Sequence, residues 1–185
     1  MEHADHVNLL RRGIPGPGGV WADFGSGSGA FTLALADLIQ PAGSIYSIDQ
    51  DGSALQAQER QMKVRFPQVQ VHYWKTNYTR PLELPPLDGI IAANTLHFLQ
   101  HKEPVLDLFY AYLKPAGRMI LVEYNVEQGN YAVPYPLPYP AWERLAQRTG
   151  FTATQLLATR PSRFLREIYS ALSTKEWKTG QVFET

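Results

Sequence analysis

Hydrophobic positions along this chain follow two alternating spacings from residue 20 onward. A short apolar stretch at residues 20–24 predicts a buried strand, and the apolar residues of 31–40 then recur at the spacing of one helical face. The turn between them, at residues 25–29, contains three glycines. The first half of the pattern therefore predicts a strand, a glycine-rich turn and a helix.

The same alternation continues to the end of the chain. Further strands are predicted at residues 44–48, 69–74, 89–93 and 118–124. Helices are predicted at residues 3–12, from a capping box at 53–56 to just before Pro67, from Pro104 to a break at 114–117, and at 141–149. The strands predicted at 151–159 and 164–172 are too close for a crossover helix and are therefore antiparallel. We expect a doubly wound, mostly parallel α/β sheet, followed by a frayed tail from Lys175.

The glycine-rich turn is the first candidate for chemistry. Glycine permits positive φ and a close approach of the backbone to a ligand. The helix behind the turn offers unpaired N–H groups and the positive end of its dipole, which suit a polar, partly anionic ligand such as a nucleotide-like cofactor. Asp49 closes the strand at 44–48, about 20 residues on, where an acid can accept both ribose hydroxyls.

The glycine spacing by itself leaves two ligands open. Gly25-x-Gly27-x-x-Ala30 fits the dinucleotide fingerprint in its alanine variant. The same residues also fit an acid-x-Gly-x-Gly-x-Gly pattern that begins at Asp23. The downstream acid, Asp49, belongs to both patterns.

Composition narrows the classes of function. Seventeen basic and seventeen acidic residues give a formal net charge of zero, so the basic footprint of a nucleic-acid-binding protein is absent. The chain has no cysteine, no apolar run of membrane-spanning length and no signal-peptide pattern, and its histidines lack metal-ligand spacing. We expect one domain over residues 1–185, located in the cytoplasm, without a metal, membrane or nucleic-acid partner.

From residue 18 to about residue 172, the order of motifs resembles that of class I S-adenosylmethionine-dependent methyltransferases that act on small molecules. Residues 23–29 resemble the first motif of that family, and Asp49 resembles the acid that ends its second strand. Residues 76–78, residues 87–98 and the Leu-Lys-Pro-Ala-Gly-Arg turn at 113–118 resemble its later motifs. Ser26, Ser28 and Asn77 differ from the Cys, Thr and Asp common there, and the chain lacks a longer N-terminal helical region.

The resemblance implies a seven-stranded sheet of order 3-2-1-4-5-7-6 with strand 7 antiparallel. It implies S-adenosylmethionine as the cofactor, S-adenosylhomocysteine as its product, and methyl transfer to an N, O or C atom of a small-molecule acceptor. The cofactor-binding residues that it implies are Asp23, Gly25, Ser26, Gly27, Asp49, Gln50, Asn77, Tyr78 and Asn94. The acceptor atom and the oligomeric state do not follow from it.

His97 is the candidate catalytic residue. It follows the strand at 89–93 and is the residue nearest the expected methyl group that titrates near neutral pH. It would serve as a general base if the acceptor is a hydroxyl or an acidic carbon, and otherwise as a packed residue. The aperiodic segment 125–140 holds Tyr131, Tyr135, Tyr139 and four prolines. We predict that this segment covers an aromatic-lined acceptor pocket above His97.

Two alternatives remain at this point. Tyr110-x-x-x-Lys114 reproduces the signature of short-chain dehydrogenases, which would make the protein an NAD(P)-dependent oxidoreductase. The glycine spacing of that family is not matched, and Tyr110 falls on an amphipathic helix. The second alternative is a protein that binds S-adenosylmethionine without transferring its methyl group.

Overall fold

The computed structural model describes residues 1–176. Its α-helices are α1 (His3–Arg11), α2 (Ala30–Ile39), α3 (Gly52–Arg65), α4 (Glu103–Tyr112) and α5 (Tyr139–Arg148), and a short 3-10 helix, η1, spans Leu96–Phe98. Its strands are β1 (Val20–Phe24), β2 (Ser44–Asp49), β3 (Gln70–Lys75), β4 (Leu87–Ala93), β5 (Leu113–Tyr124), β6 (Phe151–Pro161) and β7 (Glu167–Lys175). No helix among residues 1–176 is both long and apolar enough to cross a membrane.

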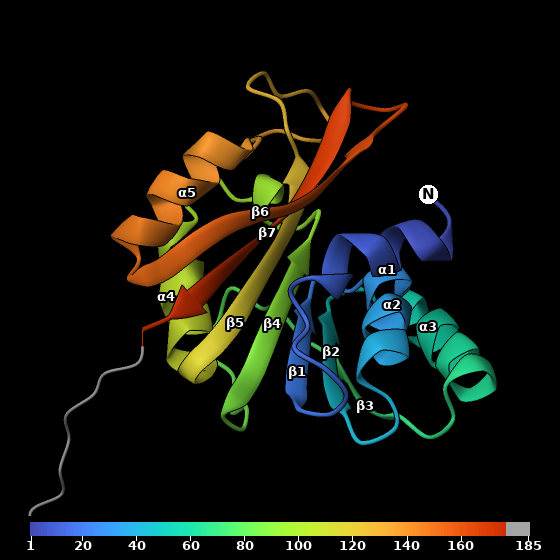
Figure 1. Cartoon of the computed structure of the whole chain (residues 1–185). Coiled ribbons are helices and arrows are strands. Elements are labelled where there is room, and N and C mark those ends of the chain that lie inside the picture. Colours follow the sequence, from blue (N-terminus) through green and yellow to red (C-terminus); the bar gives the residue numbers. More distant parts are fainter. Residues whose placement is uncertain (177–185) are drawn as a thin grey trace, which may run out of the picture.

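The strands form one seven-stranded sheet of order β3-β2-β1-β4-β5-β7-β6 (Figure 1). Strands β1 to β5 pair in parallel, whereas β7 runs antiparallel to both β5 and β6. The predicted strand order and direction are therefore confirmed. Helices α2 and α3 connect β1 to β2 and β2 to β3, α4 connects β4 to β5, and residues 76–86 connect β3 to β4 without a helix. The antiparallel end follows from the short turn between β6 and β7.

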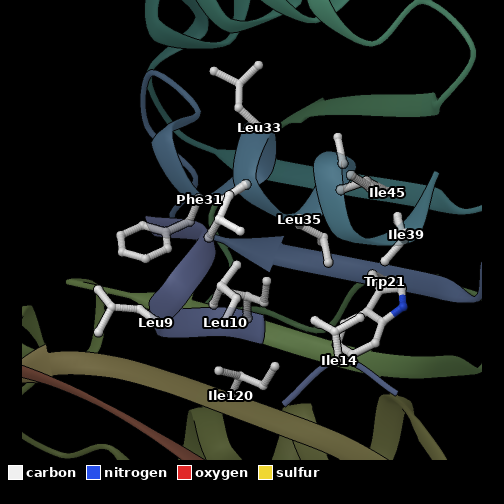
Figure 2. Packing of buried hydrophobic residues seen from close by; sticks show 14 of the residues in the cluster. Leu9, Leu10, Ile14, Trp21, Phe31, Leu33, Leu35, Ile39, Ile45 and Ile120 are labelled. Carbon is white, nitrogen blue, oxygen red and sulfur yellow. The ribbon is translucent and has the colours of Figure 1, made fainter. Parts of the chain in front are cut away.

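Helices cover both faces of the sheet. Helices α1, α2 and α3 lie on one face, and α4 and α5 lie on the other (Figure 1). On the first face, Leu10 of α1, Leu35 of α2, Trp21 of β1 and Ile120 of β5 share one buried cluster (Figure 2). Burial of apolar surface in this cluster and in a second one on the opposite face holds the helices against the sheet.

The start of α3 differs from the predicted capping box. Asp51, not Ser53, is the N-cap residue, and its Oδ1 accepts hydrogen bonds from the backbone N–H of Ser53 (2.9 Å) and Ala54 (3.2 Å). A carboxylate reaches the N–H groups two and three residues onward, so it satisfies the first turn directly.

The last two predicted turns are also corrected. Strand β5 begins at Leu113 instead of residue 118, because Leu113 pairs with Leu87 before an irregularity, with Ala116 at φ +60°. The hairpin tip lies at residues 162–166, and Lys175 belongs to β7. The remainder of the predicted frayed tail, residues 177–185, lies outside the described residues.

Candidate cofactor and acceptor site

The predicted site residues gather at the carboxyl ends of three neighbouring strands. The glycine loop follows β1, Asp49 ends β2, and Asn94 and His97 follow β4. Strand β1 lies between β2 and β4. The strand order continues through β2 to one edge of the sheet and through β4 to the other edge. Ligands of open α/β sheets bind at such a switch point.

The glycine loop is fixed to β2 by backbone contacts. Gly25 N–H donates to the carbonyl of Ile48 at 2.8 Å, and Gly27 N–H donates to Asp49 Oδ2 at 2.8 Å. A Cβ at Gly25 would collide with Thr95, and one at Gly29 would collide with Gln58. Gly27 has a left-handed φ of +53° and open space where a Cβ would point. Packing thus excludes side chains at the outer two glycines, while Gly27 faces the opening of the site.

Asp49 stands half-buried beside that opening. Its Oδ2 accepts the Gly27 N–H, and its Oδ1 accepts the backbone N–H of Asp51 at 2.8 Å. The two oxygens of a carboxylate offer about four acceptor positions, so capacity remains for two further donors. The geometry is compatible with the predicted acceptance of ribose hydroxyls.

Two residues that sequence reasoning missed support the loop from behind. The Ser47 hydroxyl lies 2.8 Å from the Ser26 hydroxyl and 3.1 Å from Gln58 Oε1, and all three side chains are buried. Gln58 fills the space beside Gly29. The available signal was a serine between the apolar residues Tyr46 and Ile48 of β2 and a glutamine on the inner face of α3.

Asp23 is buried below the loop and contacts α2. Its Oδ2 accepts a hydrogen bond from Thr32 Oγ1 at 2.5 Å, so the carboxylate ties β1 to the first turn of the helix. Burial raises the pKa of Asp23 from 3.8 to about 7, with a further contribution from the charge of Asp49. The Thr32 hydrogen bond opposes this shift.

The raised pKa of Asp23 predicts a pH-dependent stability. Between pH 3.8 and about 7 the folded state binds more protons at Asp23 than the unfolded state, so the free energy of unfolding should fall as pH rises. The contribution is on the order of 4 kcal/mol, at 1.36 kcal/mol per pKa unit. Asp23→Asn should flatten this dependence in urea denaturation at pH 4 to 8, whereas the exposed Asp107→Asn should leave it unchanged. Identical profiles for Asp23→Asn and wild type would contradict this origin.

The three residues predicted to lie around an adenine ring differ in their burial and in their contacts. Asn77 Oδ1 accepts from Thr79 N–H at 2.9 Å, so Asn77 closes the turn after β3. Tyr78 is buried, contacts Phe24 edge-on and donates its hydroxyl to the carbonyl of Thr95 at 3.3 Å. Gln50 is exposed beside Asp49. Tyr78 therefore packs in the core, and its contact with an adenine ring, like those of Asn77 and Gln50, stays a prediction.

Asn94 provides an independent test of whether the site fits a cofactor. Its backbone has a left-handed φ of +51°, and its N–H donates to the carbonyl of Val122 at 2.8 Å. Its Oδ1 is buried and has no hydrogen-bond partner among residues 1–176. An unpaired buried acceptor is costly unless a ligand supplies the donor. Together with the open space at Gly27, it matches a ligand that brings an N–H or ammonium group.

His97 is held by a buried carboxylate. Its Nδ1 lies 2.6 Å from Glu123 Oε2, and both side chains are almost completely buried. Glu123 Oε1 accepts the backbone N–H groups of Thr95, Leu96 and His97 at 3.0–3.2 Å. Because an ionised carboxylate only accepts hydrogen bonds, Nδ1 carries the hydrogen of this contact, and in the neutral ring Nε2 keeps the lone pair. Sequence reasoning missed Glu123, whose signal was an acid at the end of an apolar strand.

The segment 125–140 lies against His97, but two of its three tyrosines have other surroundings. Tyr135 N–H donates to the carbonyl of His97 at 3.0 Å, which places the loop beside His97. Tyr131, however, is 94% exposed, and Tyr139 begins α5 and packs on Tyr169. A cavity of about 530 Å³ lies on the side of Tyr124, whose ring is 6.2 Å from that of His97. The aromatic-lined pocket between His97 and segment 125–140 stays a prediction.

The dehydrogenase-like pair Tyr110 and Lys114 lies away from this edge. Lys114 forms an ion pair with Asp88 at the start of β4 at 2.7 Å, and Tyr110 packs edge-on against Phe151. Both residues stand near the amino ends of β4 and β5, opposite the glycine loop. They stabilise the fold at this end and do not face the candidate site.

Comparison with known proteins agrees with this geometry. A family model described as a methyltransferase domain matches residues 22–119. The hybrid PKS-NRPS synthetase lepA of Aspergillus flavus is 26% identical over 158 residues, which cover 72% of this chain and 4% of that protein. This chain thus spans only a small part of the curated relative that it matches.

Solved structures share the fold at low identity. A SAM-dependent methyltransferase from Aquifex aeolicus superposes with a TM-score of 0.71 at 17% identity, covering 92% of this chain and 89% of that one. The CurJ carbon methyltransferase superposes with a TM-score of 0.69 at 19% identity, covering 90% of this chain and 51% of that one.

Proposed function

Because the chain belongs to the methyltransferase domain family, we propose that it transfers the methyl group of S-adenosylmethionine to an acidic carbon of a small-molecule acceptor. The observation that carries the proposal is the buried Glu123–His97 pair beside the glycine-loop site. The pairing of all seven strands in one sheet supports a single domain as the unit of this activity.

The cofactor half of the site follows from the residues already described. S-adenosylmethionine, when bound, supplies an electrophilic methyl group on a sulfonium. Asp49 would accept the ribose hydroxyls, Gly27 would allow the cofactor to lie against the backbone, and Asn94 would accept from the amino group. The orphaned Oδ1 of Asn94 and the open space at Gly27 support this assignment.

The acceptor half requires a base for some acceptors and not for others. An amine is nucleophilic without help, whereas a carbon between two carbonyls must first lose a proton. His97 Nε2 would take that proton, while Glu123 holds the ring and stabilises the imidazolium that forms. Carbon is favoured over oxygen by the similarity to the CurJ carbon methyltransferase and to the hybrid PKS-NRPS synthetase lepA.

The two alternative functions have less support. The Tyr110 and Lys114 pair of an NAD(P)-dependent oxidoreductase lies at the opposite end of the sheet. A protein that only binds S-adenosylmethionine would have no use for a base fixed by a buried carboxylate. Calorimetry with S-adenosylmethionine and NAD distinguishes the proposed function from the oxidoreductase. A methyl-transfer assay distinguishes it from a protein that only binds S-adenosylmethionine.

We expect labelled S-adenosylmethionine to methylate the central carbon of acetoacetyl-N-acetylcysteamine, which carbon NMR of the product would establish. Asp49→Ala should weaken cofactor binding by about 1.5–3 kcal/mol, the cost of losing hydrogen bonds to a charged group. The exposed Asp107→Ala should have no effect. Tighter binding of NAD, or cofactor binding that Asp49→Ala leaves unchanged, would overturn the assignment of this site.

A further inference from the structure

The cavity beside Tyr124 has walls from three separate parts of the chain. The start of α1, the end of β5 and the β6–β7 hairpin tip line its volume of about 530 Å³. Register pairs Tyr124 with Ile168, so the hairpin tip stands at the carboxyl end of β5 (Figure 1). This is the edge of the sheet that carries the glycine loop and His97.

A row of aromatic rings leads from the base into this cavity. The ring centroids of His97 and Tyr124 are 6.2 Å apart, and those of Tyr124 and Phe164 are 5.7 Å apart in an edge-on contact. Phe164 is 50% exposed although it is a large apolar residue. The row therefore offers an apolar wall along which an acceptor can lie, with its reactive carbon at His97 and its other end at the hairpin.

Charge differs between the walls of the cavity. Asp5 Oδ1 forms an ion pair with Arg160 at 2.7 Å, so these two charges offset each other. Glu2, the N-cap residue of α1, belongs to the helical wall. Arg163, next to Phe164 on the hairpin wall, has no acidic partner within 4 Å among residues 1–176. Arg163, one of the unneutralised cations of the lining, thus stands at the far end of the aromatic row.

We propose that the hairpin tip selects acceptors that carry an oxyanion at the end remote from the reacting carbon, and that Arg163 is the residue that binds this oxyanion. A guanidinium presents several N–H donors in a plane that fits a carboxylate or a phosphate. The inference rests on the proposed function and adds the charge and orientation of the acceptor. Arg163 acts on acceptor binding and takes no part in proton removal.

Three acetoacetyl thioesters test the proposal. Their thiols are 3-mercaptopropionic acid, which adds a carboxylate, 2-mercaptoethyl phosphate, which adds a phosphate, and the neutral N-acetylcysteamine. We expect Arg163→Gln to lower kcat/KM for the charged thioesters by about three- to tenfold, because the contact is exposed, and to change the neutral one less than twofold. Raising the salt to about 0.5 M should reduce the wild-type preference. The charged thioester whose kcat/KM falls more in Arg163→Gln identifies the preferred oxyanion.

The matched control is Arg166→Gln, which removes the same charge from the same hairpin tip but lines a separate cavity with residues 125–128. It should not alter the preference, and Arg163→Lys should restore part of it. Calorimetry of each thioester with the S-adenosylhomocysteine complex gives the same comparison without turnover. Equal binding of charged and neutral thioesters overturns the role of Arg163. If the neutral thioester is methylated and Arg163→Gln does not change the preference for charged thioesters, this inference alone is overturned. If charged thioesters bind more tightly but none is methylated, only the proposed function is overturned.

Discussion

His97→Ala is expected to lower kcat for carbon methylation by about 10²–10⁴-fold near neutral pH, the range typical of a lost general base. The loss should diminish as pH rises, because an acceptor carbon between two carbonyls then ionises without help. Cofactor affinity should change little, since the ring contacts Glu123 and Tyr124 and not the glycine loop. Stopped assays from pH 6 to pH 10, with calorimetry at each end, measure both quantities.

Glu123→Gln separates the base from the group that positions it. A glutamine amide facing Nδ1 would favour the opposite tautomer and place the hydrogen on Nε2, so turnover should fall although His97 is still present. The exposed His101→Ala is the matched control and should retain full turnover.

A loss of turnover in His97→Ala that is equal at every pH would make His97 a packing residue. Loss of cofactor binding in His97→Ala would indicate a damaged fold.

Gly27→Val is expected to abolish measurable cofactor binding, with an increase in Kd of more than about 100-fold, or 2.7 kcal/mol at 1.36 kcal/mol per tenfold change. The new side chain would occupy the open space above the loop, at the point where Gly27 N–H meets Asp49. A β-branched residue at a φ of +53° should also destabilise the fold by about 1–3 kcal/mol. Calorimetry measures the first effect, and thermal denaturation measures the second.

Gly18→Val is the matched control for this strain. Gly18 has a comparable left-handed φ of +89° and only ordinary contacts for a Cβ, and it lies in the turn before β1, at the other end of the sheet. It should lose similar stability and keep cofactor binding. Equal loss of binding in both variants would show that Gly27 acts through the stability of the fold. Collapse of the circular dichroism spectrum of Gly27→Val alone would lead to the same conclusion.

The order of elements and the position of Asp49 beside the glycine loop could be predicted from the sequence, because both depend on local patterns. Apolar residues at helical or strand spacing determine which segments pack, and short parallel connections leave few ways to order the strands. The turn from β1 to α2 and the acid that ends β2 are each readable within a few residues. Their meeting follows from the adjacency of β1 and β2, which the predicted order already contained.

The Glu123–His97 pair and the cavity beside Tyr124 depend on contacts between distant segments. Glu123 reaches His97 because β4 and β5 pair in a register that sets Ala93 beside Val122, which a local pattern does not specify. The same holds for Ser47 and Gln58 behind the glycine loop. The cavity beside Tyr124 combines α1, Tyr124 and the hairpin tip, and it depends on the antiparallel pairing that sets Tyr124 beside Ile168. Periodicity determined which residues face inward, and only tertiary packing decided which of them meet.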